Sequence, residues 1–361
     1  MVAICRIMCQ ALVGYLVWHG KTDPRRRHRS GNLLIDMIVT LTMNPCVDLN
    51  LEVEAFEFGT PLRAVAERKR AGGKGVNVSQ ALAVLGVQSV AVVPLGGPGG
   101  DEFAQLAEAQ FAGGPTRLVA APVAGNTRTN IVTQETRTGR QLKVNQQGPL
   151  LTEADAAQAI AALDEYVGYG DVVALCGSLP RGVESGFYAE LVRRYRARGA
   201  FVALDGDGEA LRLAAEQKPH AVKPNREELS RWAGEDLDDP SAFHLAAGRI
   251  ARAVAGLCLA TSGASEALLA GPDFLMRLQP PEVSGSAVGA GDAALAGLLA
   301  GITRAGDPAR AVSDPTIRQT AFRLAVACGA AAASTPDTEM FTAAQLAAVQ
   351  AALGEPEPVG A

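Results

Sequence analysis

A single carboxylate stands among small residues at the start of an apolar run near the end of the chain. In SAVGAGDAALAGLLAG, residues 286–301, Asp292 follows Gly289, Ala290 and Gly291. Asp is a favoured helix-starting residue, and its charge suits the positive end of the helix dipole. Taken alone, the segment therefore favours a helix cap over a functional carboxylate, and the rest of the sequence has to decide between the two.

Two further polar motifs follow or adjoin apolar segments that predict strands and helices. Asp48 lies in NPCVD, which suits an Asn-Pro turn or, alternatively, a carboxylate that accepts hydrogen bonds from sugar hydroxyls. Lys74 lies in AGGKGVNVSQALAVLG, where a helix start offers bare amides, a dipole and an ammonium to an anion. This motif matches neither GxxxxGK[ST] nor GxGxxG, so the common nucleotide-binding fingerprints do not apply, and a dehydrogenase is disfavoured.

Three more motifs follow predicted strands. Asn225 and Glu228 lie three residues apart in VKPNREEL, a spacing that is also typical of an ordinary helix start. Gly177 and Ser178 lie at a strand end in LCGSLPRGV. The segment LDGDGEAL, which contains Asp205, lacks the glycine and the glutamate of a calcium-binding loop and is excluded as one.

Strands and helices alternate from residue 37 onward and position these motifs. Apolar runs predict buried strands at 37–43, 89–96, 171–177, 200–205, 220–225 and 256–261, and helical spacing predicts helices at 75–86, 152–167, 184–199, 226–234 and from 292. GGPGGDEF, from residue 96, predicts a loop. This order predicts an α/β fold with a mostly parallel sheet covered by helices on both faces. Ligands bind beyond the carboxyl ends of such strands, where the motifs lie.

Two segments depart from this alternation, at about residues 48–63 and 126–147. LNLEVEAFEFG and TRTNIVTQETRTGRQLKVNQQG alternate polar and apolar residues with a period of two, and TRTGRQ suits a hairpin turn. Half-exposed strands of this kind predict a small antiparallel flap, or lid, over one edge of the main sheet.

Composition limits what the protein can bind. The 361 residues are 48% apolar and 20% charged with a net charge of −5, which excludes global disorder and disfavours nucleic-acid partners. The six cysteines are scattered, without CxxC pairs or histidines at metal-ligand spacing, so we expect buried thiols in a cytoplasmic compartment and no zinc site. ALVGYLVW near the N-terminus is too short for a membrane span, so no membrane partner is expected.

The two ends of the chain fit the α/β pattern poorly. Residues 1–36 contain no element that the pattern needs, and Met37 opens the first clear strand. We therefore expect an extension at 1–36, with Met37 as a candidate true start; a secretory signal is disfavoured because no small-residue cleavage site follows. Residues 37–350 are predicted to form the main domain, and 351–361 a disordered tail.

The motifs together resemble a known family. GGKGVNVSQALAVLG and VGAGDAALAGLLAG are similar to the two signature regions of the ribokinase-like, phosphofructokinase-B family of sugar kinases. TLTMNPCVD, CGSLPRGV and KPNREELSRWAG resemble its hexose-phosphate branch, in the same order, and the resemblance covers about residues 37–350. It implies a ribokinase-like three-layer fold with a β lid, and a kinase that uses ATP and Mg²⁺.

The resemblance also implies roles for individual residues. Asp292 would be the general base that takes the proton from the sugar hydroxyl, while amides of the preceding small residues form the hole for phosphoryl charge. Those residues are Gly289, Ala290 and Gly291. Lys223, Thr261 and Gly263 would lie beside the nucleotide, and Asn225 and Glu228 would position Mg²⁺ through water. The implied sugar-side residues are Asp48, Gly73, Lys74, Asn77, Arg128 for the substrate's own phosphate, and Arg63 as a second candidate for it.

Three positions depart from the family pattern. Glu266 stands where a glycine is frequent in the nucleotide turn, Ala287 replaces a frequent threonine, and LDGDGEAL replaces a serine-containing form. None of them touches the candidate base or the Asn225–Glu228 pair. We therefore expect activity to be retained, with the geometry of the nucleotide turn left open.

The cations on the sugar side favour a phosphorylated substrate. Lys74, Arg128 and Arg63 suit recognition of a phosphate. Within the family, the resemblance is greatest to the branch that converts fructose 1-phosphate to fructose 1,6-bisphosphate. Kinases of tagatose 6-phosphate or fructose 6-phosphate are alternatives, as is a catalytically silent sugar-phosphate sensor. A homodimer formed through the lid is a further expectation.

Overall fold

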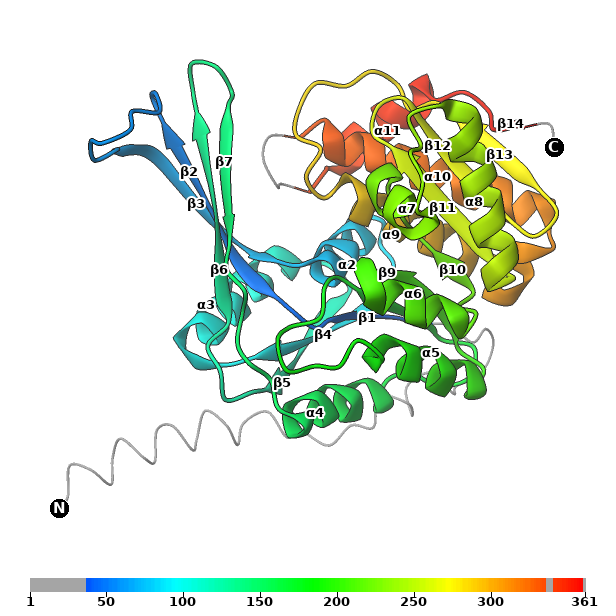
Figure 1. Cartoon of the computed structure of the whole chain (residues 1–361), viewed down its shortest axis with the longest axis horizontal. Coiled ribbons are helices and arrows are strands. Elements are labelled where there is room, and N and C mark those ends of the chain that lie inside the picture. The colour runs from blue at the N-terminus through cyan, green and yellow to red at the C-terminus, as the bar shows by residue number, and fades with distance from the viewer. Residues whose placement is uncertain (1–36, 336–339, 360–361) are drawn as a thin grey trace. The chain divides into compact units, whose positions relative to one another are not determined.

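A largely parallel sheet carries the fold. The computed structural model describes residues 37–335 and 340–359 (Figure 1). In spatial order the strands of this sheet are β14 (Glu357–Pro358), β13 (Leu275–Leu278), β12 (Glu266–Ala270), β11 (Leu257–Ser262), β10 (Ala221–Val222), β9 (Phe201–Asp205), β8 (Val172–Cys176), β1 (Ile38–Thr42), β4 (Ser89–Leu95) and β5 (Thr116–Pro122). The strands from β11 to β5 in this order run parallel, and β12 to β14 pair antiparallel.

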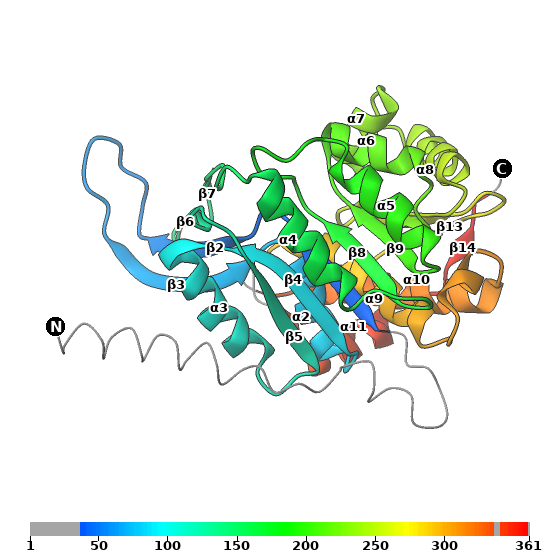
Figure 2. The same cartoon turned by 90° about the horizontal axis from the view of Figure 1, so that it is seen from below.

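Helices cover both faces of this sheet because its strands are apolar on both sides. On β1, Ile38 packs into one layer and Val39 into the other, and neighbouring strands repeat the alternation. One layer contains α2 (Lys74–Val84), α9 (Ala290–Thr303), the short η2 (Pro308–Val312), α10 (Pro315–Ala333) and α11 (Ala343–Ala352). The other, with α4 and α5 nearest the viewer in Figure 2, contains α4 (Glu153–Asp164), α5 (Phe187–Ala197), α6 (Gly208–Glu216), α7 (Arg226–Ala233) and α8 (Pro240–Val254). The predicted α/β three-layer fold is confirmed.

A second, four-stranded sheet forms the lid, which projects beyond the main sheet in Figure 1. Its order is β3 (Ala64–Gly72), β2 (Cys46–Val53), β6 (Arg128–Glu135) and β7 (Gln141–Asn145). The two outer pairings are antiparallel as expected, whereas the central pairing of β2 with β6 is parallel. Strand β3 is absent from the predicted elements because AVAERKRAG is charged and lacks clean alternation, and residues 54–63 contain no strand.

Two sequence predictions are wrong. GGPGGDEF is not a loop but the start of α3 (Gly97–Phe111), whose glycines allow the first turn to pack tightly: a Cβ on Gly99 would lie 2.3 Å from the carbonyl oxygen of Thr127. The expected tail is not disordered over 351–359, because β14 pairs with β13 and Glu357 forms an ion pair with Arg277. The predicted extension at 1–36 lies outside the described residues, and no helix within them is long and apolar enough to cross a membrane.

Helix α9, which begins with the small residues before Asp292, packs closely against α10. A Cβ on Gly297 would lie 2.5 Å from the carbonyl oxygen of Leu324 and 2.8 Å from the Cα of Ala325. Main-chain atoms cannot yield as the end of a flexible side chain can. The glycine therefore sets the distance between the two helices, and with it the position of the helix that holds Asp292.

We predict that Gly297→Val lowers the free energy of unfolding by about 1–3 kcal/mol, because the added atoms overpack the interface between α9 and α10. Thermal melts would measure the effect. Gly354→Ala is the matched control, since a Cβ at Gly354 meets nothing within 4 Å. A Gly297→Val protein that melts together with the parent would show that the two helices can separate at little cost.

Candidate active site

Loops that follow the parallel strands bring the sequence motifs to one edge of the main sheet. Asp205 ends β9, and Lys223 and Asn225 follow β10. Gly73 caps the amino end of α2, Asn225 that of α7 and Gly289 that of α9. Residues at the amino ends of all three helices lie beside this edge, and their positive dipole ends favour an anionic ligand there.

A pocket of about 490 Å³ opens at this edge of the sheet. It is lined by the following predicted site residues: Lys74, Lys223, Asn225, Glu228, Thr261, Gly263, Gly289, Ala290, Gly291 and Asp292. Apolar side chains, among them Pro280, Pro281, Val283 and Val326, complete the lining. The volume is that of a small-molecule site, and the lining suits a ligand with both an apolar and an anionic part.

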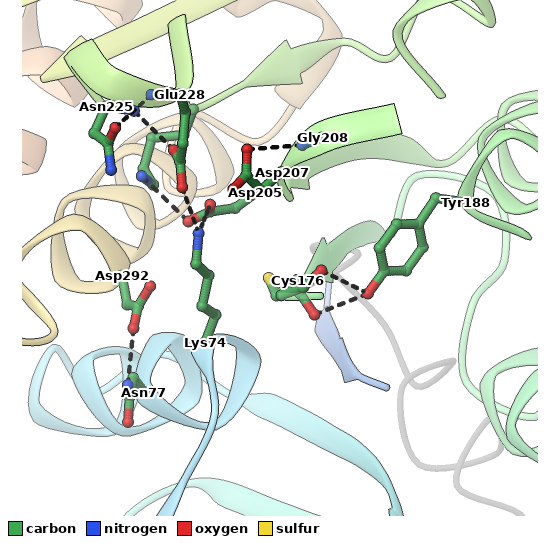
Figure 3. A network of polar contacts seen from close by, with 12 residues as sticks. Lys74, Asn77, Cys176, Tyr188, Asp205, Asp207, Gly208, Asn225, Glu228 and Asp292 are labelled. Atoms are coloured by element: carbon green, nitrogen blue, oxygen red, sulfur yellow. Dashed lines mark hydrogen bonds and ion pairs between the residues drawn. The ribbon is translucent and has the colours of Figure 1, made fainter. Parts of the chain in front are cut away.

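A buried carboxylate ties two lysines together at the polar side of this pocket (Figure 3). The Nζ atom of Lys74 lies 2.8 Å from Oδ1 of Asp205 and 3.1 Å from Oε1 of Glu228. The Nζ atom of Lys223 lies 3.3 Å from the other oxygen of Asp205. The network thereby joins the first residue of α2 to the end of β9, the residue after β10 and the first turn of α7.

The charges of this network stabilise one another. Burial by itself would raise the pKa of Asp205 and lower that of Lys74. The ammonium groups of Lys223 and Lys74 nevertheless hold the pKa of Asp205 below its ordinary value. Although burial lowers the pKa of Lys74, the carboxylates of Asp205 and Glu228 outweigh it and hold that pKa well above its ordinary value. Both side chains therefore stay charged at neutral pH.

Asp292 occupies the first turn of α9, after Gly289, whose φ of 79° is left-handed and suits glycine. The Nδ2 atom of Asn77, on α2, donates a hydrogen bond of 2.8 Å to Oδ2 of Asp292 (Figure 3). Burial, and next the negative charge of Asp205, raise the pKa of Asp292 to about 6, against the opposing effect of Lys74 and of the Asn77 hydrogen bond. The carboxylate is thus ionised at neutral pH yet more basic than an exposed one.

Asn225 and Glu228 form a capping box at the start of α7. Oδ1 of Asn225 accepts a hydrogen bond from the Glu228 amide at 2.8 Å, and Oε2 of Glu228 accepts one from the Asn225 amide at 2.9 Å. The spacing of Asn225 and Glu228 is therefore that of an ordinary helix start. The remaining carboxylate oxygen of Glu228 faces Lys74, so the same pair also contributes charge to the pocket.

The predicted sugar-side residues are divided between two places: Lys74 lines the pocket and Asn77 contacts Asp292, whereas Asp48 and Arg128 lie at the base of the lid. Oδ1 of Asp48 accepts hydrogen bonds from Asn130 and Cys46, each at 3.1 Å. Burial raises the pKa of Asp48, and its other oxygen is so close to Gly72 that a Cβ there would lie 2.0 Å away. The lid thus places a carboxylate against the glycine pair that precedes α2.

The two predicted arginines differ in their surroundings. Arg128 begins β6, and its guanidinium donates hydrogen bonds to the main-chain carbonyls of Asn44, Pro45 and Gln146 at 3.0, 3.4 and 2.7 Å. Arg63 is exposed directly before β3. Arg128 therefore has a defined position beside the ends of the lid strands, whereas the position of Arg63 depends on the exposed edge of the lid.

Comparison with known proteins agrees with this geometry. Residues 37–342 match the pfkB family of carbohydrate kinases. The chain is 39% identical to the 1-phosphofructokinase of Rhodobacter capsulatus over 266 residues, which are 73% of this chain and 82% of that protein. The chain belongs to the pfkB carbohydrate kinase family. It is thus a kinase that transfers a phosphoryl group to an alcohol group.

Solved structures extend the likeness to the fold of this kinase. Phosphofructokinase-2 from Escherichia coli, in complex with substrates and products, is 26% identical with a TM-score of 0.79, covering 88% of this chain and 99% of that one. A ribokinase from Thermotoga maritima, 15% identical, has a TM-score of 0.67 with the same coverage. The predicted ribokinase-like fold is confirmed.

The site of this kinase contains one charged residue to which the sequence analysis gives no role. Asp205 bridges the two lysines, whereas its motif is predicted only not to be a calcium loop and to depart from the family's serine-containing form. Its place at the end of a parallel strand is the signal that could have identified it, because that position is where ligands bind.

The departures from the family pattern leave the pocket intact. The turn after β11 closes without a glycine at Glu266, because Gly263 takes the left-handed conformation with a φ of 55°. Glu266 instead begins β12 opposite Ser262, and its carboxylate lies 2.9 Å from the ring of His244. Ala287 lines the pocket, and Asp207 of LDGDGEAL caps α6.

We predict that Asp292→Asn stabilises this kinase above pH 6. The pKa of Asp292 rises from 3.8 to about 6 on folding, so the parent loses stability as the carboxyl ionises between these pH values. The loss amounts to at most about 3 kcal/mol, and Asn does not ionise while still accepting the bond from Asn77.

Thermal melts from pH 4 to pH 8 would test this. The melting temperature of Asp292→Asn relative to the parent should rise as the pH increases to about 6 and then level off. Asp273→Asn, in the exposed turn after β12, is the control and should show no such trend. A variant less stable than the parent at pH 8 would show that the nearby lysines stabilise the charged carboxylate more than burial destabilises it.

Proposed function

We propose that this kinase transfers the γ-phosphate of ATP to a hydroxyl of fructose 1-phosphate, forming fructose 1,6-bisphosphate. The observation that carries the proposal is the position of Asp292, which lines the pocket yet is hydrogen-bonded to Asn77 on α2. One carboxylate thus lies between the pocket and α2, the helix that begins directly after the lid strand β3. The likeness to a 1-phosphofructokinase supports the choice of acceptor.

In this proposal the residues divide the work of phosphoryl transfer. Asp292 removes the proton from the attacking hydroxyl, and its raised pKa makes it a better base. The amides of Gly289, Ala290 and Gly291, at the positive end of α9, stabilise the negative charge on the phosphoryl group. Asn77 orients the carboxylate, so that positioning and electrostatics supply most of the rate enhancement.

The nucleotide side fits MgATP. ATP is the co-substrate that the family implies, and Lys223, Thr261 and Gly263 line the pocket where it would lie. Within the described residues no group of three or more acidic, His or Cys side chains forms a metal cage. Asn225 and Glu228 would therefore hold Mg²⁺ through water, as this ion prefers, and the ion would neutralise phosphate charge.

On the sugar side, Asp48 and Gly73 would receive the sugar hydroxyls, and Arg128 and Arg63 its phosphate. Lys74 belongs to the same motif as Gly73, but its ammonium lines the pocket beside Asp205 and Glu228. We place it between the two ligands, where a compact positive charge would face phosphate oxygens. Arg128 supports a phosphorylated rather than a free sugar because guanidinium groups bind phosphate in two-pronged geometry.

An assay of ADP release with four acceptors tests the proposal: fructose 1-phosphate, fructose 6-phosphate, tagatose 6-phosphate and ribose. We expect the highest kcat/KM with fructose 1-phosphate. Asp292→Asn should lower kcat roughly 10²–10⁴-fold with little change in KM, since the base acts mainly in the transition state. Equal background rates on all acceptors would instead support a sugar-phosphate sensor.

We further propose that two copies associate through the lid. Strand register places Leu49, Ile131 and Val144 side by side, with Leu51 and Leu142 next to them on the same face. Leu142 and Val144 are 56% and 50% exposed, an apolar surface that a second copy would cover.

The buried cysteines support a cytoplasmic location, where thiols stay reduced. Within the described part of the chain, these cysteines form no disulfide: Cys46, Cys176, Cys258 and Cys328.

We predict that the double variant Leu142→Lys, Val144→Lys weakens self-association at least about tenfold, because it places charges in an apolar interface. Light scattering after size-exclusion chromatography would measure the mass. Leu245→Lys is the control, since Leu245 is 65% exposed on α8, far from the lid in sequence. A parent that is monomeric at micromolar concentration, or a double variant that dimerises like the parent, would contradict the lid interface.

A further inference from the structure

Two arginines from different parts of the fold meet the same short segment. Residues 146–148 follow β7 and lead toward α4. Nη1 of Arg128, on the lid, donates a hydrogen bond of 2.7 Å to the carbonyl of Gln146. Nη2 of Arg181, on the loop after β8 of the main sheet, donates one of 2.9 Å to the carbonyl of Gly148. The two guanidinium groups thus bind carbonyls only two residues apart.

Gly148 is where the surrounding groups converge. Its φ of 82° is left-handed, and a Cβ there would lie 2.5 Å from Oδ1 of Asn44 and 3.3 Å from Cδ of Arg128. Arg181 contacts the same residue through its carbonyl. Asn44, Arg128 and Arg181 therefore surround one glycine, although they come from the end of β1, the start of β6 and the loop after β8.

Asn44 supplies an independent sign that a ligand binds here. Only 8% of the residue is exposed, and its Oδ1 atom has no hydrogen-bond partner among the described residues. Its Nδ2 atom donates to the hydroxyl of Ser178 at 3.3 Å, and Ser178 is exposed. These side chains follow the adjacent parallel strands β1 and β8, at the edge where ligands bind. A buried acceptor without a partner is costly, and a ligand hydroxyl would satisfy it.

The hydrogen bonds of the two arginines within the described residues all go to neutral main-chain carbonyls. A phosphate is a stronger acceptor, because bonds between ions are about twice as strong as neutral ones. Arg181 is exposed and free to exchange a carbonyl for such an anion. The site thus holds two guanidinium groups beside Oδ1 of Asn44, an acceptor without a hydrogen-bond donor among the described residues.

We propose that Arg181 and Arg128 together bind the phosphate that the sugar already carries, and that Arg181 sets the preference for phosphorylated over free sugars. The inference rests on the proposed function and adds to it a residue from the main sheet. Because one arginine belongs to the lid and the other to the main sheet, the bound phosphate would also join these two parts of the fold.

Two substitutions separate this role from a purely structural one. Arg181→Lys keeps the charge, whereas Arg181→Gln keeps a donor for the Gly148 carbonyl but removes the charge. We expect Arg181→Gln to raise the KM for fructose 1-phosphate about 10- to 100-fold, which is the scale of a lost charge-assisted bond. Arg181→Lys should keep the KM for fructose 1-phosphate much closer to that of the parent, because the charge remains. The KM for ATP and the kcat/KM for unphosphorylated fructose should stay within about twofold of the parent.

Arg137→Gln is the matched control, since Arg137 is exposed in the turn between β6 and β7 of the lid. The proposal is overturned if Arg181→Gln leaves the KM for fructose 1-phosphate unchanged, or if Gln restores function as well as Lys does. It is also overturned if both variants lower the melting temperature and raise both KM values together.

Calorimetry with fructose 1-phosphate separates failure of this inference from failure of the proposed function. A parent that binds fructose 1-phosphate but phosphorylates no acceptor would refute the kinase reaction, and Arg181→Gln would still be expected to weaken binding. A parent that neither binds nor phosphorylates it would refute both.

Discussion

The site depends on one buried carboxylate whose charge must be matched. Asp205 has no exposed side-chain surface, and a charge in that position is costly unless it is paired. Its partners come from Lys74 at the start of α2 and Lys223 after β10. Placing these two ammonium groups on one carboxylate requires the helix start and the strand ends to meet at a fixed distance. The position of the pocket is a consequence of that requirement.

The same carboxylate makes Asp292 more basic. Burial, and next the charge of Asp205, raise the pKa of Asp292, while Lys74 and the Asn77 hydrogen bond limit the rise to about 6. Without the opposing groups the pKa of the carboxylate would rise further, and a closer pairing with a lysine would lower it and make the carboxylate a weaker base. The arrangement of two acids and two lysines avoids both extremes, at a cost in stability that is typical of active sites.

Features that depend on local sequence could be predicted, and features that depend on distant partners could not. The strand at Ile38–Thr42 and the capping box of Asn225 follow from neighbouring residues. The bridging role of Asp205 does not, since Lys74 lies 131 positions earlier in the sequence. The start of helix α3 could not be predicted for the same reason. Its glycines allow close packing against Thr127, a distant residue, whereas in the local sequence they indicate a loop.

The lid shows how one alternating pattern serves two surfaces. Successive residues of a strand point to opposite faces, so Asp48 and its register partner Asn130 share one face, while Leu49 and Ile131 share the other. The first pair is polar and hydrogen-bonded, and the second pair is apolar. A shift of the β2–β6 register by one residue would exchange these faces and turn the carboxylate away from the glycines before α2. The parallel pairing of β2 with β6 over its whole length therefore determines which face of the lid carries Asp48 and which face carries the apolar side chains.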